Sequence, residues 1–192
     1  MRAPAPPYRG EGAHALWHVS EDRTLTRFEP HRAATALRDE PLVWAIDTRH
    51  LPLFWFPREC PRGTFWADDH TRADDAERLL VGSPRVHAIQ GDWLHAMRSA
   101  RVVAYRLPED TFSPDLEVGG YWLSREPVAP LELVELGDLL ALHADAGIEL
   151  RVVPDLWSLW ERVIASTLQF SGIRLANLSP QPSSERASSP AA

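Results

Sequence analysis

One stretch, Leu42–Trp66, constrains the fold more than any other part of the chain. It begins with the apolar run Leu42–Ile46, which is typical of a buried strand. The polar residues Asp47 and Thr48 follow, with side chains suited to capping a helix, and then comes an aromatic-rich block, His50–Phe56. Such a block can belong to the core or can line a ligand pocket, and the sequence leaves both interpretations open.

The segment PRECPRG continues this stretch and holds the single cysteine, Cys60, between Arg58 and Arg62. Two prolines stiffen the backbone there, so both arginine side chains start from a rigid loop. Neighbouring positive charge can make a cysteine reactive, although a lone cysteine is more commonly a buried apolar residue. The segment therefore offers candidate anion-binding arginines.

Composition limits the classes of protein that this chain can be. Its 192 residues suit one domain, and no apolar run is long enough to span a bilayer. A single cysteine and the absence of a secretory leader predict a cytoplasmic protein. A net charge of −7 argues against broad binding to nucleic acids or anionic membranes. All 20 basic residues are arginine, which excludes Schiff-base lysine chemistry and a Walker phosphate loop.

The order of periodic segments predicts an α+β fold, with many short strands and a few helices in one domain at residues 13–178. Residues 1–12 are expected to be a flexible lead and residues 179–192 a disordered Ser/Pro/Ala tail. The predicted strands are 15–19, 42–46, 64–66, 86–89, 102–107, 121–123, 131–136 and 148–153. The predicted helices are 73–80, 93–98, 138–146 and a long C-terminal one.

The long C-terminal helix is expected to start after Asp155 as its cap and to run to about Leu175. Apolar residues recur at helical spacing within it. This pattern predicts that Trp160 and Ile164 belong to the core.

A short strand near the N-terminus carries the first candidate site. Alternation along a strand places His18 and Ser20 on the same face, where a histidine and a hydroxyl can hold the hydroxyls of a ribose. A surface histidine beside a helix-capping serine is the alternative.

The segment GGYWLSREPVAP carries the second candidate site. The two glycines permit a close approach to Tyr121, and Pro127 holds Glu126 extended at a strand end. A carboxylate there suits a cleft, or it can simply pair with Arg125. Histidine and cysteine spacing matches no metal motif, so no metal site is predicted.

Segments LWHVSED, VWAID, FWFPRECPR, GYWLSREPVAPLELVEL and IELRVVPDLW resemble an uncharacterised bacterial protein family of similar length. More distantly, the order of elements resembles the ADP-ribosyltransferase superfamily, which includes RNA 2′-phosphotransferases. His18 and Ser20 match its early H-x-S/T strand. Trp44–Asp47 with Leu53–Phe56 is similar to the strand and aromatic helix that pack around the nicotinamide end of NAD.

The sequence departs from that superfamily at the third motif. Gly120 and Tyr121 stand where a glutamate often occurs, and Glu126 follows five residues after Tyr121. The resemblance therefore implies a catalytic carboxylate that this chain can supply only from a shifted position.

The resemblance implies an ADP-ribosyltransferase-like fold and an NAD- or nucleotide-binding protein, with ADP-ribosyl transfer or NAD hydrolysis as the activity. A carboxylate would stabilise the oxocarbenium-like state at the ribose, and arginines would clamp the pyrophosphate. The expected ligand is a nucleotide, with NAD as cofactor and no metal. The candidate catalytic residues are His18, Glu126 and Tyr121, and the candidate cofactor-binding residues are Ser20, Asp47, Trp55, Arg58 and Arg62.

Two other functions fit the same residues. One is a non-catalytic nucleotide-binding or interaction module, and the other is a phosphate-handling RNA or nucleotide enzyme that needs no glutamate. The NAD- or nucleotide-binding interpretation carries one geometric expectation, that His18, Ser20, Arg58 and Tyr121 converge on one pocket.

Overall fold

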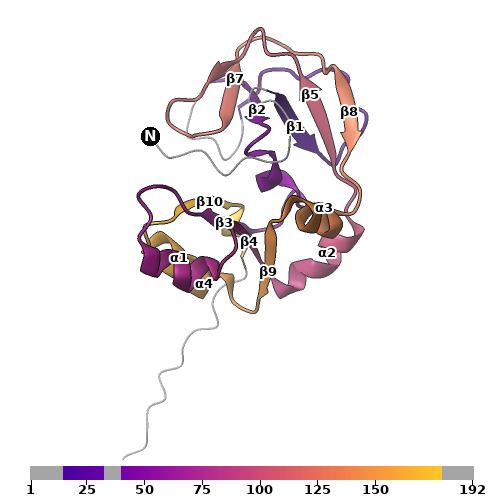
Figure 1. Ribbon diagram of the computed structural model, residues 1–192. Coiled ribbons are helices and arrows are strands. Elements are labelled where there is room, and N and C mark those ends of the chain that lie inside the picture. Colours follow the sequence, from indigo (N-terminus) through magenta and orange to yellow (C-terminus); the bar gives the residue numbers. More distant parts are fainter. Residues whose placement is uncertain (1–14, 33–39, 179–192) are drawn as a thin grey trace, which may run out of the picture.

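Two β-sheets lie one above the other in the computed structural model, which describes residues 15–32 and 40–178 (Figure 1). The larger sheet has six strands, and all of its neighbouring strands are antiparallel. In spatial order they are β6 (Ser113–Pro114), β7 (Tyr121–Ser124), β2 (Val43–Asp47), β1 (Leu16–Ser20), β5 (Val103–Leu107) and β8 (Glu132–Glu135).

The smaller sheet has four strands and mixed direction. In spatial order they are β10 (Gln169–Ile173), β3 (Arg62–Trp66), β4 (Arg85–Gln90) and β9 (Glu149–Val153). Only the β4–β9 pair is parallel among them. The chain between β4 and β9 crosses the larger sheet through β5 to β8, so neither sheet is built from one continuous segment.

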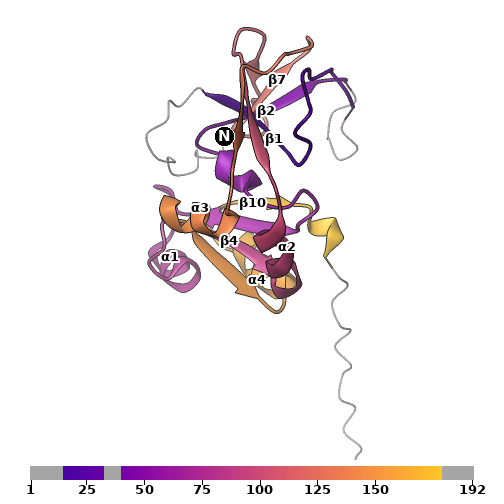
Figure 2. The same cartoon turned by 90° about the vertical axis from the view of Figure 1, so that its right-hand side faces the viewer.

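In the described part of the chain, four α-helices cover the smaller sheet and the junction between the sheets. Helices α1 (Ala73–Leu80) and α4 (Leu156–Ile164) lie on the face of the smaller sheet that points away from the larger one (Figures 1 and 2). Helices α2 (Leu94–Ser99) and α3 (Leu139–Ala146) lie at the junction. The 3₁₀ helices are η1 (Leu51–Phe54), η2 (Gly91–Trp93) and η3 (Leu175–Asn177).

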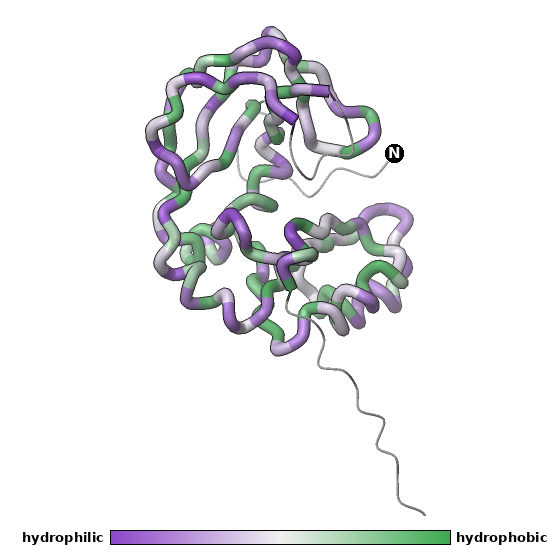
Figure 3. The backbone as a smooth tube through the Cα atoms, turned by 180° about the vertical axis from the view of Figure 1, so that it is seen from behind, coloured by the Kyte–Doolittle hydropathy of each residue, from purple (hydrophilic) through white to green (hydrophobic). Residues whose placement is uncertain are grey.

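The two faces of the larger sheet pack against different partners. Its outer face, which carries Leu16 and Tyr105, packs under loops that contribute Phe28 and Val128. Its inner face carries Trp17, Ile46 and Ala104, and these share one core with Ile89 and Ile148 of the smaller sheet and with Trp55 and Phe56. Apolar segments run through both sheets and the connection between them (Figure 3). The shared core makes the described chain one compact α+β domain, as predicted.

Local sequence explains most of the element boundaries. Gly147 ends α3 in the left-handed region at φ 69°, where a side chain would be strained. Asp155 caps α4 by accepting a hydrogen bond from the amide of Ser158 at 3.2 Å. The Asp155 cap and the end of the helix predicted at 138–146 had been expected from the sequence.

The predicted long C-terminal helix is wrong. Helix α4 ends at Ile164, and residues 169–173 instead form β10, which pairs with β3. The turn between them is fixed by Asp75, whose carboxylate accepts hydrogen bonds from the amide and hydroxyl of Thr167, both at 2.9 Å. The helical periodicity ends there, and Ile164 is half exposed instead of belonging to the core.

The predicted flexible lead and tail, residues 1–12 and 179–192, lie outside the described residues. In the part of the chain that the structure describes, no helix is long and apolar enough to cross a membrane.

Candidate functional site

His18 and Ser20 point to the outer face of the larger sheet, as the alternation predicts. The Nδ1 atom of His18 lies 3.0 Å from the carbonyl oxygen of Trp44, and the imidazole packs on Phe28 with 4.7 Å between ring centroids. The Oγ atom of Ser20 accepts a hydrogen bond from the amide of Asp22 at 3.0 Å. The strand and its neighbours therefore fix the orientation of both side chains.

Arg58 approaches the same region from the proline-rich loop. Its backbone amide donates to the Glu21 carboxylate at 3.0 Å, which ties the loop to the end of β1. Its side chain is 61% exposed, and its Nε atom lies 3.7 Å from the Glu59 carboxylate. The loop that carries Arg58 is thus tied to the end of β1, and the charge of Arg58 acts on His18.

His18 is held in its neutral form at this position. Burial lowers the pKa of His18, the hydrogen bond to Trp44 opposes that shift, and the positive charge of Arg58 adds to the lowering. A neutral imidazole that donates its Nδ1 hydrogen to a carbonyl has its lone pair on Nε2. No other described residue forms a hydrogen bond with Nε2, so this atom can accept a hydrogen bond from a ligand.

Tyr121 does not join this group, which corrects the expectation of one shared pocket. It is paired with Ile46 in the β2–β7 ladder and therefore points to the inner face, whereas His18 points to the outer face. Its ring packs against Trp44 and Phe54, at centroid distances of 5.7 and 6.2 Å. The body of the sheet separates it from His18.

Two more predicted ligand contacts are part of the buried core between the sheets. Arg62 is 3% exposed, donates to the carbonyl oxygens of Leu53 and Cys60, and lies between the rings of Phe54 and Phe56. Trp55 is 1% exposed and packs edge-on against His143, with 5.7 Å between ring centroids. The Arg62 guanidinium is therefore engaged in holding the η1 segment, and burial lowers its pKa to about 10.

Asp47 also lies between the sheets, at the end of β2. Its carboxylate accepts hydrogen bonds from the backbone amide of His50 at 2.9 Å and from the imidazole Nδ1 of His50 at 2.7 Å. These bonds shape the corner that leads into η1. Thr48, expected to cap a helix, instead accepts a hydrogen bond from the Trp17 indole at 2.9 Å.

Glu126 lies in an exposed turn after β7. Its carboxylate forms no hydrogen bond or ion pair with any other residue that the structure describes, and Arg125 pairs with Glu40 instead. Two residues later, Val128 pairs with Phe28, whose ring packs on His18. The segment that bears Glu126 therefore crosses the same outer face as His18.

Cys60 is buried, and burial raises the pKa of its thiol to about 12. A protonated, buried thiol is a poor nucleophile at neutral pH. Within residues 15–32 and 40–178, no group of three His, Cys, Asp or Glu side chains could hold a metal ion.

A buried histidine pair between the sheets was not predicted from the sequence. Nδ1 of His87 lies 3.0 Å from Nε2 of His143, and Nδ1 of His143 lies 2.7 Å from the carbonyl oxygen of Leu139. Burial lowers the pKa of His143 to about 4 and that of His87 well below its usual range. Alternation in β4 could have placed His87 on the inner side, but its partner is 56 residues away.

Two hollows beside β5 and β8 were also not predicted from the sequence. One is a cleft of about 360 Å³ whose lining includes Arg23, Arg98 and Arg101, and the other is a largely apolar cavity of about 130 Å³ next to Trp17 and Trp55. Trp55 is the one predicted site residue that lines either hollow. The three arginines come from separate loops and a helix end, so no local pattern marks them as a group.

Comparison with known proteins identifies one match. A family model described as "Family of unknown function (DUF6886)" matches residues 17–178. No curated protein and no solved structure matches the chain.

Proposed function

Because the chain belongs to the DUF6886 family of unknown function, its activity has to be inferred from its own residues, and we propose that it binds NAD or a related phosphorylated nucleotide. The observation that carries the proposal is the fixed, neutral His18 beside Arg58 at the end of β1. We assign the site to His18, Ser20 and Arg58, on the outer face of the larger sheet.

The chemistry of the three groups suits a ribose phosphate. The free Nε2 of His18 accepts a hydrogen bond from a sugar hydroxyl, and the Ser20 hydroxyl can donate one to a ligand oxygen. The exposed guanidinium of Arg58 presents a fork of donors that matches a phosphate. Arg62 and Tyr121 are not part of this site, because both face the core between the sheets.

Glu126 is the carboxylate that the proposal assigns to catalysis, since its segment crosses the same sheet face. A carboxylate near the ribose would stabilise the oxocarbenium-like state formed when the nicotinamide–ribose bond breaks. This part of the proposal rests on the resemblance to ADP-ribosyltransferases. A binding module without turnover is the alternative, and a cytoplasmic location suits either one.

Calorimetric titration with NAD, ADP-ribose and a 2′-phosphorylated RNA end tests the proposal. His18→Phe keeps an aromatic ring on Phe28 but removes the acceptor, and Arg58→Gln removes the guanidinium. Each variant should weaken nucleotide binding about tenfold or more, equivalent to about 1.4 kcal/mol.

Arg125→Gln is the matched control, because Arg125 is also exposed but pairs with Glu40. It should bind like the wild type. Equal affinity in all four proteins would refute the site, and the absence of any binding would refute the proposed function.

A further inference from the structure

The cleft of about 360 Å³ beside β5 collects three arginines from separate parts of the chain. Arg23 follows β1, Arg98 lies in α2, and Arg101 lies between α2 and β5. All three are exposed, whereas Val102 and Val103, which also line the cleft, are buried. The charged side chains therefore form the part of the lining that a ligand meets first. A cleft lined by positive charge raises the local concentration of anions.

Two of the three arginines have donors to spare. Arg98 forms no hydrogen bond or ion pair with any other residue in the ranges that the structure describes. Arg101 uses only its Nη1 group, which donates to the carbonyl oxygens of Ser99 and Ala100 at 3.3 and 3.2 Å. These two bonds hold the Arg101 side chain at the end of α2 and leave its Nη2 and Nε donors available.

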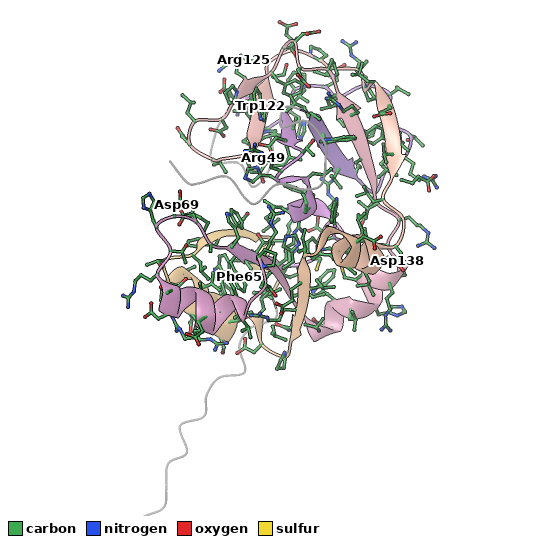
Figure 4. The ribbon with its side chains drawn as sticks, in the orientation of Figure 1. Arg49, Phe65, Asp69, Trp122, Arg125 and Asp138 are labelled. Atoms are coloured by element: carbon green, nitrogen blue, oxygen red, sulfur yellow. The ribbon has the colours of Figure 1, made fainter. Side chains whose placement is uncertain are left out.

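The two carboxylates in the lining already have partners. Glu135 pairs with Arg23. Asp138, labelled in Figure 4 where α3 begins, accepts hydrogen bonds from the amides of Leu140 and Ala141 at 2.9 and 3.2 Å. Its charge is therefore directed at the positive end of the helix dipole. Three arginines and two carboxylates leave the lining with a net charge of +1, in a chain whose net charge is −7.

We propose that this cleft binds a small phosphate ester, with the phosphate group on the available donors of Arg98 and Arg101. A phosphate ester carries nearly two negative charges at neutral pH and several acceptor oxygens, which the guanidinium fork matches. The cleft volume lies near the lower end of the usual range for small-molecule sites, so an ester of a few carbon atoms suits it. His18 and Arg58 do not line the cleft, so this inference is independent of the proposed nucleotide site.

Calorimetric titration of the full chain with glycerol 3-phosphate, glycerol and inorganic phosphate tests the inference. Glycerol 3-phosphate should bind about tenfold or more tightly than glycerol, because only the ester brings negative charge to the guanidinium groups. It should also bind more tightly than inorganic phosphate, because its organic part occupies space in the cleft that the ion leaves to water. An ester that binds no more tightly than either of the other probes, or no binding at all, would overturn the proposal.

A double variant locates the binding. Arg98→Gln combined with Arg101→Gln should weaken the binding of glycerol 3-phosphate about tenfold or more. The matched control combines Arg125→Gln with Arg162→Gln, which removes the same charge elsewhere and should bind like the wild type. Figure 4 shows Arg125 at the opposite edge of the larger sheet from α3, and Arg162, like Arg101, donates to a carbonyl oxygen of its own helix region. Equal weakening in both double variants would reveal a general effect of charge and would refute the site.

Glu135→Gln separates a binding role of the arginines from a structural one. The change removes a negative charge from the cleft and releases Arg23, so the affinity for glycerol 3-phosphate should rise about twofold or more. Arginines that only stabilise the end of α2 would give no such gain, and that result would contradict the proposal.

Two further measurements distinguish this site from other anion sites. His18→Phe and Arg58→Gln should leave the binding of glycerol 3-phosphate unchanged, although both should weaken nucleotide binding. Failure of one site is therefore distinguishable from failure of the other. Binding of single-stranded nucleic acid without binding of the small ester would assign the cleft to a macromolecule and would overturn the proposal.

Discussion

Two glycines with nearly the same backbone angle have different surroundings. Gly120 has φ 85° and Gly82 has φ 86°. A β-carbon at Gly120 would overlap the imidazole of His50, whereas a β-carbon at Gly82 would meet nothing within 4 Å. Gly120 therefore combines a backbone requirement with a packing requirement, and Gly82 has only the first.

We expect Gly120→Ala to lower the free energy of unfolding by about 2–4 kcal/mol, because strain and overpacking add. Gly82→Ala should cost only about 1 kcal/mol from the strained angle. Urea unfolding of both variants measures the difference. Equal losses would mean that His50 moves aside without cost.

Glu126 is the residue whose substitution separates an enzyme from a binding module. If it stabilises the oxocarbenium-like state, Glu126→Gln should keep NAD affinity within a few fold but lower turnover roughly 100-fold or more. Nicotinamide release, followed by chromatography, is the measurement. Unchanged turnover would assign the role to another carboxylate, and no turnover in the wild type would favour the binding module.

The buried histidines make stability depend on pH. His87 and His143 stay neutral in the folded chain, since burial lowers both pKa values, but in the unfolded chain each titrates near 6.5. As the pH falls through about 6.5, the unfolded state takes up protons that the folded state does not. The free energy of unfolding should therefore decrease between about pH 7.5 and pH 5, by at most about 1.4 kcal/mol per pH unit for each histidine.

Urea unfolding at both pH values checks this. Replacing both His87 and His143 by leucine should reduce the pH dependence, and replacing the exposed His70 by glutamine should not. Part of the pH dependence should survive the double change, because burial also lowers the pKa of His18. A pH dependence as large as that of the wild type would contradict the assignment. Carboxylates with lowered pKa values lose their contribution to the free energy of unfolding only at lower pH. Their titration therefore does not affect the change measured between about pH 7.5 and pH 5.

Helix α4 and strand β10 show how one side chain joins three segments. Trp160 of α4 packs on Gly63 of β3 and Gly172 of β10, which face each other in the ladder. No larger residue fits at either glycine without moving the indole. Helix α4 thus covers the β3–β10 pair, and the chain that follows α4 forms β10 itself.

Substitutions at two positions in α4 should have very different effects on the free energy of unfolding. Trp160 is 8% exposed and Ile164 is 50% exposed. Trp160→Ala should cost about 3–5 kcal/mol of unfolding free energy, the range for a buried aromatic residue. Ile164→Ala should change it by less than about 1 kcal/mol. Thermal or urea unfolding of the two variants is decisive, and similar losses would place Ile164 in the core after all.

Most elements could be predicted from the sequence because local patterns determine them. Helix α1 follows from its periodicity, both ends of α3 follow from Asp138 and Gly147, and the start of α4, but not its end, follows from Asp155. Strand β10 could not be predicted, because its pairing depends on β3, about a hundred residues earlier. The same holds for the candidate site. Alternation along β1 is enough to place His18 and Ser20 on one face of the sheet, but only the pairing of β7 with β2 shows that Tyr121 lies on the opposite face.

The shared core couples the two sheets. Trp17 and Ile46 of the larger sheet contact the same cluster as Ile89 of the smaller one. A core that crosses between sheets leaves neither with an independent apolar interior on that side. We therefore expect one cooperative unfolding transition.

Tryptophan fluorescence and far-ultraviolet circular dichroism should give the same midpoint in urea. Separate midpoints would show that the sheets unfold independently. Filling or emptying the cavity beside Trp17, for example with Leu142→Phe, should shift both signals together.

The pairing of β3 with β10 also affects how the chain is made on the ribosome. Thr64 donates a hydrogen bond to the carbonyl of Ser171, 107 residues later. At roughly 5–20 residues per second, about 5–20 s of translation separate the two strands. During that time one edge of β3 has no native partner in the nascent chain. An exposed strand edge readily pairs with strands of other chains. We therefore expect newly made chains to avoid aggregation only with the help of chaperones, or when they are synthesised slowly and at low concentration.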